Sequence, residues 1–478
     1  MDAGSFQFVL FGLAAAIVSN FSRNRAWRSA ILLVASVGFL GLLAHNPAAL
    51  LPLFVFLLLG YAGLFLIQRG WSKSAAWSIL AILCAYIWLK KYSFLPQAIL
   101  LHHPYFTLGL SYIFFRVLHL LIEARDSREK SYIGVGRYLL YTVNFTALIS
   151  GPIQRYDEFA RDQFANEPIS LGPRVIGLQL ERVIRGFFKI NVLAVIFDML
   201  RQDALAQMLF PLPASSKYYA AFWLCILYPL FLYCNFSGYI DIVIALARLM
   251  RVRLPENFDR PFSATSFIDF WNCWHITLST WFKTYIYNPL MVALMRRFSS
   301  PATDPFLAVI CFFVAFFLVG LWHGRTSEFV MYGVLQGAGV SINKLWQLAM
   351  TRALGRKGYR DLNGNIYYVS FSRGLTFSWF AFTLFWFWAS WQQIGRCFSA
   401  IGIVAWLVVW VAVWLSASLV LGVWERLRAG LLSIRTTEGP ILTGSHARVV
   451  YASALGLTAF VFAILLSQPA PAIVYKGF

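Results

Sequence analysis

Uncharged apolar runs long enough to cross a lipid bilayer recur along this whole chain. Residues 29–68 contain no Asp, Glu, Lys or Arg, and the sequence His45-Asn46-Pro47 is the only interruption of their apolar character. A bilayer core about 30 Å thick requires about 20 mainly apolar residues per helical span. In lipid, backbone polar groups are satisfied only within helices or closed barrels. Because the runs are continuous rather than alternating, we expect an all-α polytopic membrane protein.

The charge pattern supports a membrane protein over a nucleic-acid-binding one. Only 13% of the 478 residues are charged, against about 25% in soluble proteins. The net charge is +20, but the basic residues stand mainly between apolar runs, as Arg23, Arg25 and Arg28 do. Polytopic proteins fix their orientation through such basic cytoplasmic loops. We therefore expect membrane lipid, and no nucleic acid, as a partner.

The run boundaries predict about eleven to thirteen apolar elements in one domain spanning residues 1–478. The runs are residues 6–18, 29–68 (two helices), 74–89, 92–115 (divided at His102-His103-Pro104), 138–154, 218–240, 305–322, 329–343, 374–395, 397–424 and 449–475. Ser150-Gly151-Pro152 suggests a re-entrant segment, because such backbone is tolerated at membrane depth where it lines a cavity. Residues 155–189 are amphipathic and suit the interface. The charge-dense residues 123–137 predict a cytoplasmic loop and an external N-terminus.

Polar groups enter the apolar surroundings in the central third of the chain. Residues 270–285 read FWNCWHITLSTWFKTY, and we expect one helical face to carry Trp271, Trp274, His275, Leu278, Phe282 and Tyr285. Packing is the expected role of the tryptophans. His275 is either a ligand or catalyst, or a satisfied structural histidine, because ionisable groups within membranes are costly and usually functional.

A second histidine, His323, directly follows the charge-free run 305–322 and precedes another apolar run. We therefore expect it to cap a helical hairpin. Gly320 and Gly324 flank it, and glycine allows close approach of a ligand or of backbone. Position alone leaves interfacial and catalytic roles open.

Several blocks, taken in order, resemble the membrane-bound O-acyltransferase (MBOAT) superfamily. They are LGLSYIFFRVLHLLIEARD (108–126), SGPIQRY (150–156), RVIRGFFKINVLA (182–194), YCNFSGYIDIVIALARLMRVRLPENFDRPF (233–262), SATSFIDFWNCWHITLSTWFKTYIYNPL (263–290) and GLWHG (320–324). The similarity is greatest to the bacterial branch that includes the alginate O-acetylation protein and the D-alanyl transferase of teichoic acids. It covers approximately residues 100–345.

The resemblance implies a fold of about eleven transmembrane helices, with re-entrant and interfacial helices, around a tunnel across a bacterial plasma (inner) membrane. It implies that His323 is the catalytic histidine and that His275 is the second family histidine. Asn235 stands where relatives often carry Asp, and Gln336-Gly337 where many carry His-Gly. These departures leave acyl transfer intact and the substrate open.

Acyl transfer to a hydroxyl requires a base, and imidazole is suited to that role near neutral pH. Donors to the tetrahedral oxyanion could be Asn272, Trp274 or His275, and Trp322 and Asn235 are further candidates for substrate binding. A covalent route through Cys273 is the alternative. Positions 273 and 275 do not share a helix face, so we favour direct transfer.

The donor expected from this chemistry is a cytoplasmic thioester, either acyl-CoA or an acyl carrier protein, with no bound cofactor. Arg251, Arg253 and Arg260 are candidates to hold its phosphates, although structural pairing with Asp241 and Glu256 is an alternative role for this charged region. The His, Asp and Cys spacings match no metal site.

The acceptor inherited from the resemblance is a hydroxyl of a cell-envelope glycan, reached directly or through an extracytoplasmic partner transferase. The acyl group is expected to be acetyl or another short one. Two alternatives remain. A transporter explains the many spans and broken helices, and a conduit for acyl groups would leave the chemistry to a separate enzyme.

Overall fold

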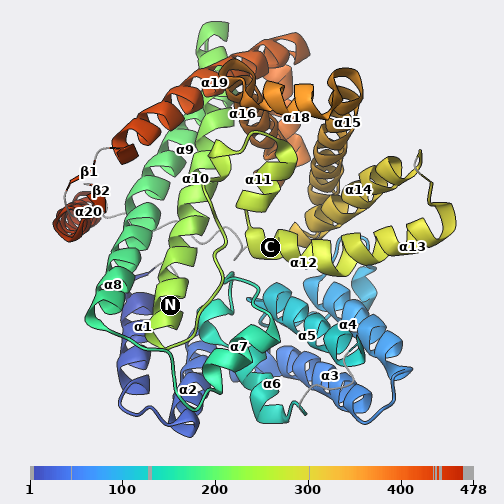
Figure 1. The fold of residues 1–478 in the computed structure, drawn as a ribbon, viewed down its shortest axis with the longest axis vertical. Helices are drawn as coiled ribbons and strands as arrows, with labels where there is room; N and C mark the ends of the chain where they lie inside the picture. Colours follow the sequence, from blue (N-terminus) through green and yellow to red (C-terminus); the bar gives the residue numbers. More distant parts are fainter. Residues whose placement is uncertain are drawn as a thin grey trace. The chain divides into compact units, whose positions relative to one another are not determined.

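The computed structural model describes residues 5–44, 46–126, 132–300, 302–433, 435–436, 439–440 and 444–466. The described chain is mainly helical, as predicted (Figure 1), with irregular connections and one short hairpin of β1 (Arg435–Thr436) and β2 (Gly439–Pro440). It divides into two compact units. Of the described residues, unit 1 holds those within 5–187 and 238–256, and unit 2 holds those within 188–237 and 257–466. The single-domain expectation stays a prediction.

Unit 1 is built mainly from the first half of the chain. Its helices are α1 (Phe6–Ser19), α2 (Arg25–Leu43), η1 (Pro47–Leu50), α3 (Leu51–Gln68), α4 (Ser74–Lys90), η2 (Gln97–Ile99), α5 (Leu110–Asp126), α6 (Val135–Thr142), η3 (Phe145–Ala147), α7 (Tyr156–Gln163) and α8 (Pro173–Phe188). The rings of Phe8, Phe39 and Phe145 pack together in its core. Asn24 caps α2 by accepting a hydrogen bond from the Ala26 amide, as polar side chains do at helix starts.

An irregular buried segment follows α6 where the sequence predicted a re-entrant one. The Arg116 side chain is 2% exposed and donates hydrogen bonds to the carbonyls of Tyr141, Thr142 and Ala147. Buried backbone outside a helix requires such partners. Arg116 therefore allows the chain to leave helical geometry inside unit 1.

Unit 2 contains the remaining helices. They are η4 (Lys189–Ala194), α9 (Val195–Leu209), α10 (Ala214–Leu249), η5 (Pro261–Ser263), α11 (Phe267–Cys273), α12 (Ile276–Phe282), η6 (Lys283–Tyr287), α13 (Asn288–Phe298), α14 (Asp304–His323), α15 (Ser327–Gly364), α16 (Ile366–Thr383), α17 (Phe385–Trp388), α18 (Trp391–Ile401), α19 (Ile403–Ser433) and α20 (Ser445–Leu466). The unit boundary falls within α10, whose residues from 238 onward belong to unit 1.

Close helix pairs in unit 2 depend on small residues. A Cβ at Gly320 of α14 would overlap the Cα of Gly333 of α15, and one at Gly374 of α16 would overlap Ser418 of α19. Both pairs lie side by side in unit 2 (Figure 1). The α14–α15 pair is the hairpin predicted around His323, and the glycines serve backbone approach there.

Five helical segments in the described residues are long and apolar enough to cross a membrane. They are Arg25–Leu43, Pro47–Gln68, Ala214–Leu249, Asp304–His323 and Ile403–Leu431. Shorter apolar helices cover Phe6–Ser19, Ser74–Lys90 and His446–Phe462. The predicted number of eleven spans stays a prediction.

Three sequence expectations were wrong in detail. Residues 92–109 are mostly irregular, so the apolar run 92–115 contributes only the start of α5. Residues 270–285 do not form one helix, because α11 and α12 are separated at 274–275. The run 397–424 is interrupted at Gly402, whose φ of 79° ends α18. Parts of two predicted segments, residues 127–131 and 467–475, lie outside the described residues.

Candidate active site

His275 occupies the break between α11 and α12. Its backbone has φ 45° and ψ 51°, in the left-handed region, and its side chain is 0% exposed. That conformation costs a non-glycine residue about 1–3 kcal/mol and is concentrated at functional sites. The surrounding structure must therefore hold this residue in place.

Asn257 provides that support from 18 positions earlier. Its carbonyl accepts a hydrogen bond from the Ile276 amide at 3.0 Å. Its side-chain Oδ1 accepts from the Thr277 amide at 3.0 Å and from the Thr277 hydroxyl at 2.9 Å. Asn257 is itself 0% exposed. The turn that presents His275 is thus fixed by a buried side chain.

The same oxygen defines the tautomer of His275. Nδ1 of His275 lies 3.3 Å from Asn257 Oδ1, and the Thr277 amide identifies that atom as the oxygen because an N–H can only donate to it. Nδ1 is therefore the donor in this contact. A neutral imidazole that donates through Nδ1 carries its lone pair on Nε2, so Nε2 is a hydrogen-bond acceptor.

His323 ends α14 and is 3% exposed. Its ring lies 5.1 Å from the ring of Phe387 in α17 and 5.8 Å from that of Tyr332 in α15, centroid to centroid. After it, Gly324 is extended, and a Cβ there would overlap the Phe329 ring. The imidazole is thus held in an aromatic setting at the α14–α15 turn.

Trp322 connects the two histidines. Its indole centroid lies 6.3 Å from the His275 ring and 4.8 Å from the His323 ring. Phe236 of α10 covers His275 from 4.9 Å. Both imidazoles therefore belong to one buried aromatic cluster of unit 2, where water is largely excluded and polar interactions strengthen.

Comparison with known proteins identifies the family. The model of the MBOAT, membrane-bound O-acyltransferase family matches residues 49–385, a range that contains both histidines and all the sequence blocks. The chain belongs to the MBOAT family. Its helical fold and apolar segments agree with a bacterial membrane protein of this family.

Several curated proteins similar to this chain have names that refer to teichoic acid, alginate or peptidoglycan. A teichoic acid D-alanyltransferase of Streptococcus thermophilus is 32% identical over 247 residues, 50% of this chain and 57% of that protein. An alginate O-acetylase, AlgI, of Pseudomonas aeruginosa is 30% identical over 264 residues, 55% and 46% of the two chains. A peptidoglycan O-acetyltransferase of Helicobacter pylori is 31% identical over 213 residues, 44% and 38%. The matches thus span about two fifths to three fifths of these relatives' lengths.

The other residues predicted to bind substrate or the oxyanion differ in their burial and in the side chains that they contact. Asn235 is 0% exposed and precedes Phe236, the ring that covers His275. Trp274 is 2% exposed and packs on Phe258 and Phe270. Asn272 is exposed and lines a small pocket with Trp271 and Val319 that neither histidine lines. The structure thus brings Trp322 to both histidines, whereas Asn272 is exposed near the end of α11.

Cys273 is poorly suited to be a nucleophile. Burial raises the pKa of its thiol above the ordinary value, and the carboxylates of Asp269 and Asp259 raise it further. The thiolate is the nucleophilic form, so this setting disfavours the covalent route that the sequence left open.

The three arginines predicted to hold the donor phosphates do not all belong to the same unit. In unit 1, Arg251 donates to Asn20 Oδ1 at 2.7 Å and to the Ile169 carbonyl at 2.6 Å. Arg253 pairs with Asp162 at 2.6 Å. Arg260 lies in unit 2, 3.8 Å from Glu425. Arg251 and Arg253 are therefore grouped, and Arg260 has a partner of its own.

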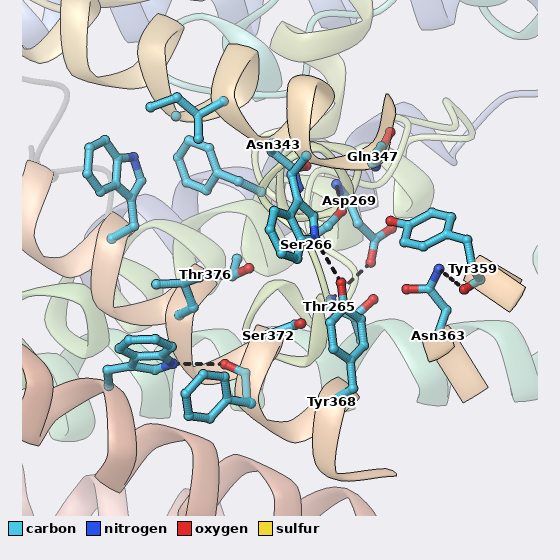
Figure 2. A pocket seen from close by; sticks show the side chains of 18 of the residues that line it. Thr265, Ser266, Asp269, Asn343, Gln347, Tyr359, Asn363, Tyr368, Ser372 and Thr376 are labelled. Atoms are coloured by element: carbon cyan, nitrogen blue, oxygen red, sulfur yellow. Dashed lines mark hydrogen bonds between the residues drawn. The ribbon is translucent and has the colours of Figure 1, made fainter. Parts of the chain in front are cut away.

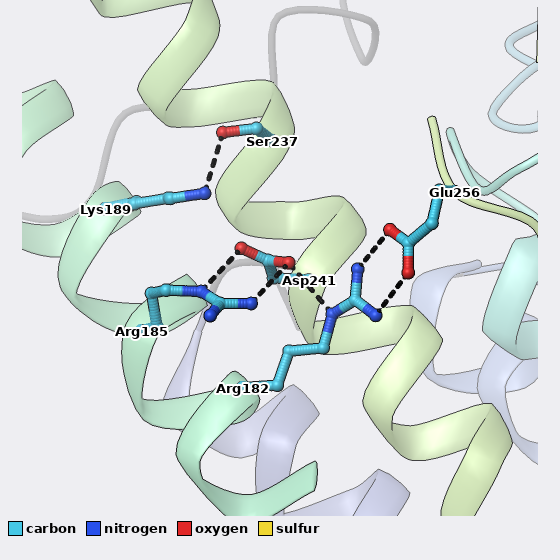
Figure 3. Close-up of polar contacts among 6 residues, drawn as sticks. All are labelled: Arg182, Arg185, Lys189, Ser237, Asp241 and Glu256. Carbon is cyan, nitrogen blue, oxygen red and sulfur yellow. Dashed lines mark hydrogen bonds and ion pairs between the residues drawn. The ribbon is translucent and has the colours of Figure 1, made fainter. Parts of the chain in front are cut away.

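The acidic residues of this region have structural partners (Figure 3). Asp241 and Glu256 share Arg182, at 2.9 Å and 2.7 Å, and Arg185 lies 3.3 Å from Asp241. Within unit 2, Lys189 donates to Ser237 at 3.2 Å. The pairing role expected for Asp241 and Glu256 is thus observed, with α8 arginines rather than Arg251 or Arg253.

Asn257 is the residue of the site that sequence reasoning missed. It was present in the block PENFDRPF, but an asparagine near prolines and charges also fits an ordinary turn. Only the contact with residues 275–277 assigns its role. Tyr332 and Phe387, which pack on His323, carry no sequence signal beyond apolar character.

Proposed function

We propose that the chain is an O-acyltransferase of a bacterial plasma membrane. It moves a short acyl group from a cytoplasmic thioester to a hydroxyl of an envelope glycopolymer. The observation that supports this most strongly is the pair of buried histidines joined by Trp322 within an MBOAT-family chain. The relatives named for teichoic acid, alginate and peptidoglycan support the class of acceptor.

In the proposed reaction, His323 acts as general base. It removes the proton of the acceptor hydroxyl as the oxygen attacks the thioester carbonyl. The tetrahedral intermediate then collapses with cleavage of the C–S bond, and the imidazolium returns the proton to the leaving thiolate. General base catalysis of this kind typically contributes about 10²–10⁴-fold.

His275 has a different proposed role. Because its Nδ1–H is directed at Asn257, neutral His275 offers an acceptor at Nε2 rather than a donor. A hydrogen-bond acceptor at Nε2 can receive the O–H of the glycan hydroxyl that is to be acylated. It cannot donate a hydrogen bond to the oxyanion. We therefore assign His275 to orienting the hydroxyl toward His323, and not to the oxyanion role that the sequence left open for it.

Donor phosphates are assigned to the arginines of unit 1. Arg28, Arg248, Arg251 and Arg253 surround residues 162–170, with Asp162 as an acidic partner. Burial and the charges of Arg23 and Arg248 lower the pKa of Arg251. Such an accumulation of like charge favours a phosphate ligand, as in coenzyme A or a carrier-linked phosphopantetheine.

Acyl transfer by the purified chain tests the proposal. The full chain is reconstituted in vesicles, supplied with radiolabelled acetyl-CoA or acetylated carrier protein, and offered teichoic acid, alginate or peptidoglycan fragments. Covalent label on one glycan, dependent on the chain alone, is expected. Label crossing the bilayer without reaching glycan would indicate a conduit, and uptake of intact solute without acyl chemistry would indicate a transporter.

A further inference from the structure

A large cavity in unit 2 lies apart from the two histidines. It encloses about 830 Å³ between α11, α15, α16 and α19, within the range of about 300–1,000 Å³ typical of ligand sites. Neither histidine lines it. Its wall includes four tryptophans, Trp346, Trp379, Trp410 and Trp414.

The cavity has an apolar part and a polar part (Figure 2). The labelled side chains of Asp269, Tyr359, Asn363 and Tyr368 gather at one side, and unlabelled aromatic rings lie at the other. A ligand with a long apolar portion and a compact polar portion matches this division.

The cavity is lined in part by apolar side chains that are exposed at the surface of unit 2. Four of its lining side chains, all apolar, are also well exposed: Ile342 (59%), Trp346 (47%), Phe371 (45%) and Leu375 (39%). They belong to α15 and α16. In an MBOAT-family membrane protein we expect such exposed apolar side chains to contact acyl chains, which would let a ligand enter the cavity from the bilayer.

Unused donors indicate the polar chemistry of the ligand. The Trp379 indole N–H is buried and has no partner among the described residues. The side chains of Gln347 and Ser372 also make no hydrogen bond within the described part of the chain. A buried N–H without an acceptor costs about the desolvation of that group, and a ligand carbonyl would relieve the cost.

Charge excludes a phosphate from the interior. Asp269 is the charged residue among the described lining side chains, and neither Arg nor Lys lines the cavity. A phosphate placed beside a carboxylate in this apolar site would be strongly destabilised. The part of the ligand inside the cavity is therefore uncharged.

We propose that this cavity binds a membrane glycerophospholipid through one fatty acyl chain. The chain lies along the tryptophans, its ester carbonyl accepts hydrogen bonds from Trp379 and neighbouring donors, and the phosphate stays outside. The site is separate from the proposed acyl-transfer site, so it is tested through binding rather than turnover.

Photo-crosslinking of the full chain in nanodiscs tests this site. The probe is phosphatidylethanolamine with a diazirine in one acyl chain, and adducts are mapped by peptide mass spectrometry. Adducts are expected to concentrate on residues 339–347, 368–379 and 410–414. Ser372→Phe fills the cavity and should abolish this concentration. Trp379→Phe removes only the N–H and should weaken probe binding about tenfold.

Trp424→Phe is the matched control, because Trp424 is exposed on α19 and does not line the cavity. It should leave the adducts unchanged. Adducts spread evenly over the lipid-facing surface, or undiminished in Ser372→Phe and Trp379→Phe, would overturn the proposal. Displacement of the probe by palmitoyl-CoA but not by unlabelled phosphatidylethanolamine would assign the cavity to a thioester chain and overturn the lipid assignment.

Discussion

Replacing Asn257 by leucine keeps the branching and the number of heavy atoms of the side chain and removes one buried oxygen. That oxygen accepts from the Thr277 amide, the Thr277 hydroxyl and His275 Nδ1. Each buried donor left without a partner costs about 1–3 kcal/mol. The amide and the imidazole both lose their acceptor, so we expect a loss of about 2–6 kcal/mol of stability, part of which relaxation of the turn recovers.

Catalysis should fall for a related reason. Without Asn257, the His275 proton is no longer held on Nδ1, and the Nε2 acceptor is lost from part of the population. A loss of about 1–3 kcal/mol of transition-state binding corresponds to about 5- to 150-fold in kcat/KM. The assay is acyl transfer by the variant that remains folded in detergent, monitored by tryptophan fluorescence on heating.

Thr277→Val is the matched control. It removes the hydroxyl bond to Asn257 but keeps the amide bond, so about 1 kcal/mol of stability and little activity should be lost. A folded Asn257→Leu variant with normal transfer would refute the role assigned to Asn257.

Three further predictions concern packing, donor binding and topology. Gly320→Ala pushes α14 away from α15, and this overpacking, worth about 1–3 kcal/mol, should lower the apparent Tm. Gly430→Ala, where the added Cβ meets open space, should leave the apparent Tm unchanged. Equal effects of the two substitutions would contradict the close packing of α14 on α15. Arg251→Gln should raise KM for the thioester severalfold, and the size of this increase should depend on salt concentration. Arg260→Gln should leave KM unchanged. An increase in KM for Arg260→Gln but not for Arg251→Gln would contradict the assignment of the donor phosphates to unit 1. Residues 69–73 are two spans before the predicted cytoplasmic loop 123–137 and should lie on the same side. A lone cysteine at Lys73 should therefore resist impermeant maleimide in intact cells, and its labelling would contradict this topology.

Helices of unit 1 and the α14–α15 hairpin were predictable because their apolar runs end at polar or glycine-proline steps. Both histidines were singled out by their apolar surroundings and by the resemblance to the MBOAT superfamily, and their catalytic roles stay predictions. The break at His275 was not predictable, since FWNCWHITL contains neither glycine nor proline and has helical periodicity. It depends on pairing of residues 257–259 with 273–276, a long-range contact that outweighs local propensity.

The grouping of basic residues also depended on tertiary structure. Arg251 and Arg260 are nine positions apart and look equivalent in sequence, yet one lies with the arginines of unit 1 and the other near Glu425. The large cavity was missed because its lining residues come from four helices. Neither apolar periodicity nor spacing along one helix brings such residues together.

The measurement that bears most directly on the proposed mechanism is acyl transfer by His323→Gln. Glutamine keeps a hydrogen-bonding side chain at the end of α14 but cannot act as a base. His103→Gln, at an exposed position, is the matched control. With insertion and apparent Tm preserved in both variants, His323→Gln should transfer at least about 10²-fold more slowly and the control at the normal rate. Near-normal transfer by a folded His323→Gln variant would contradict the assignment of His323 as the base.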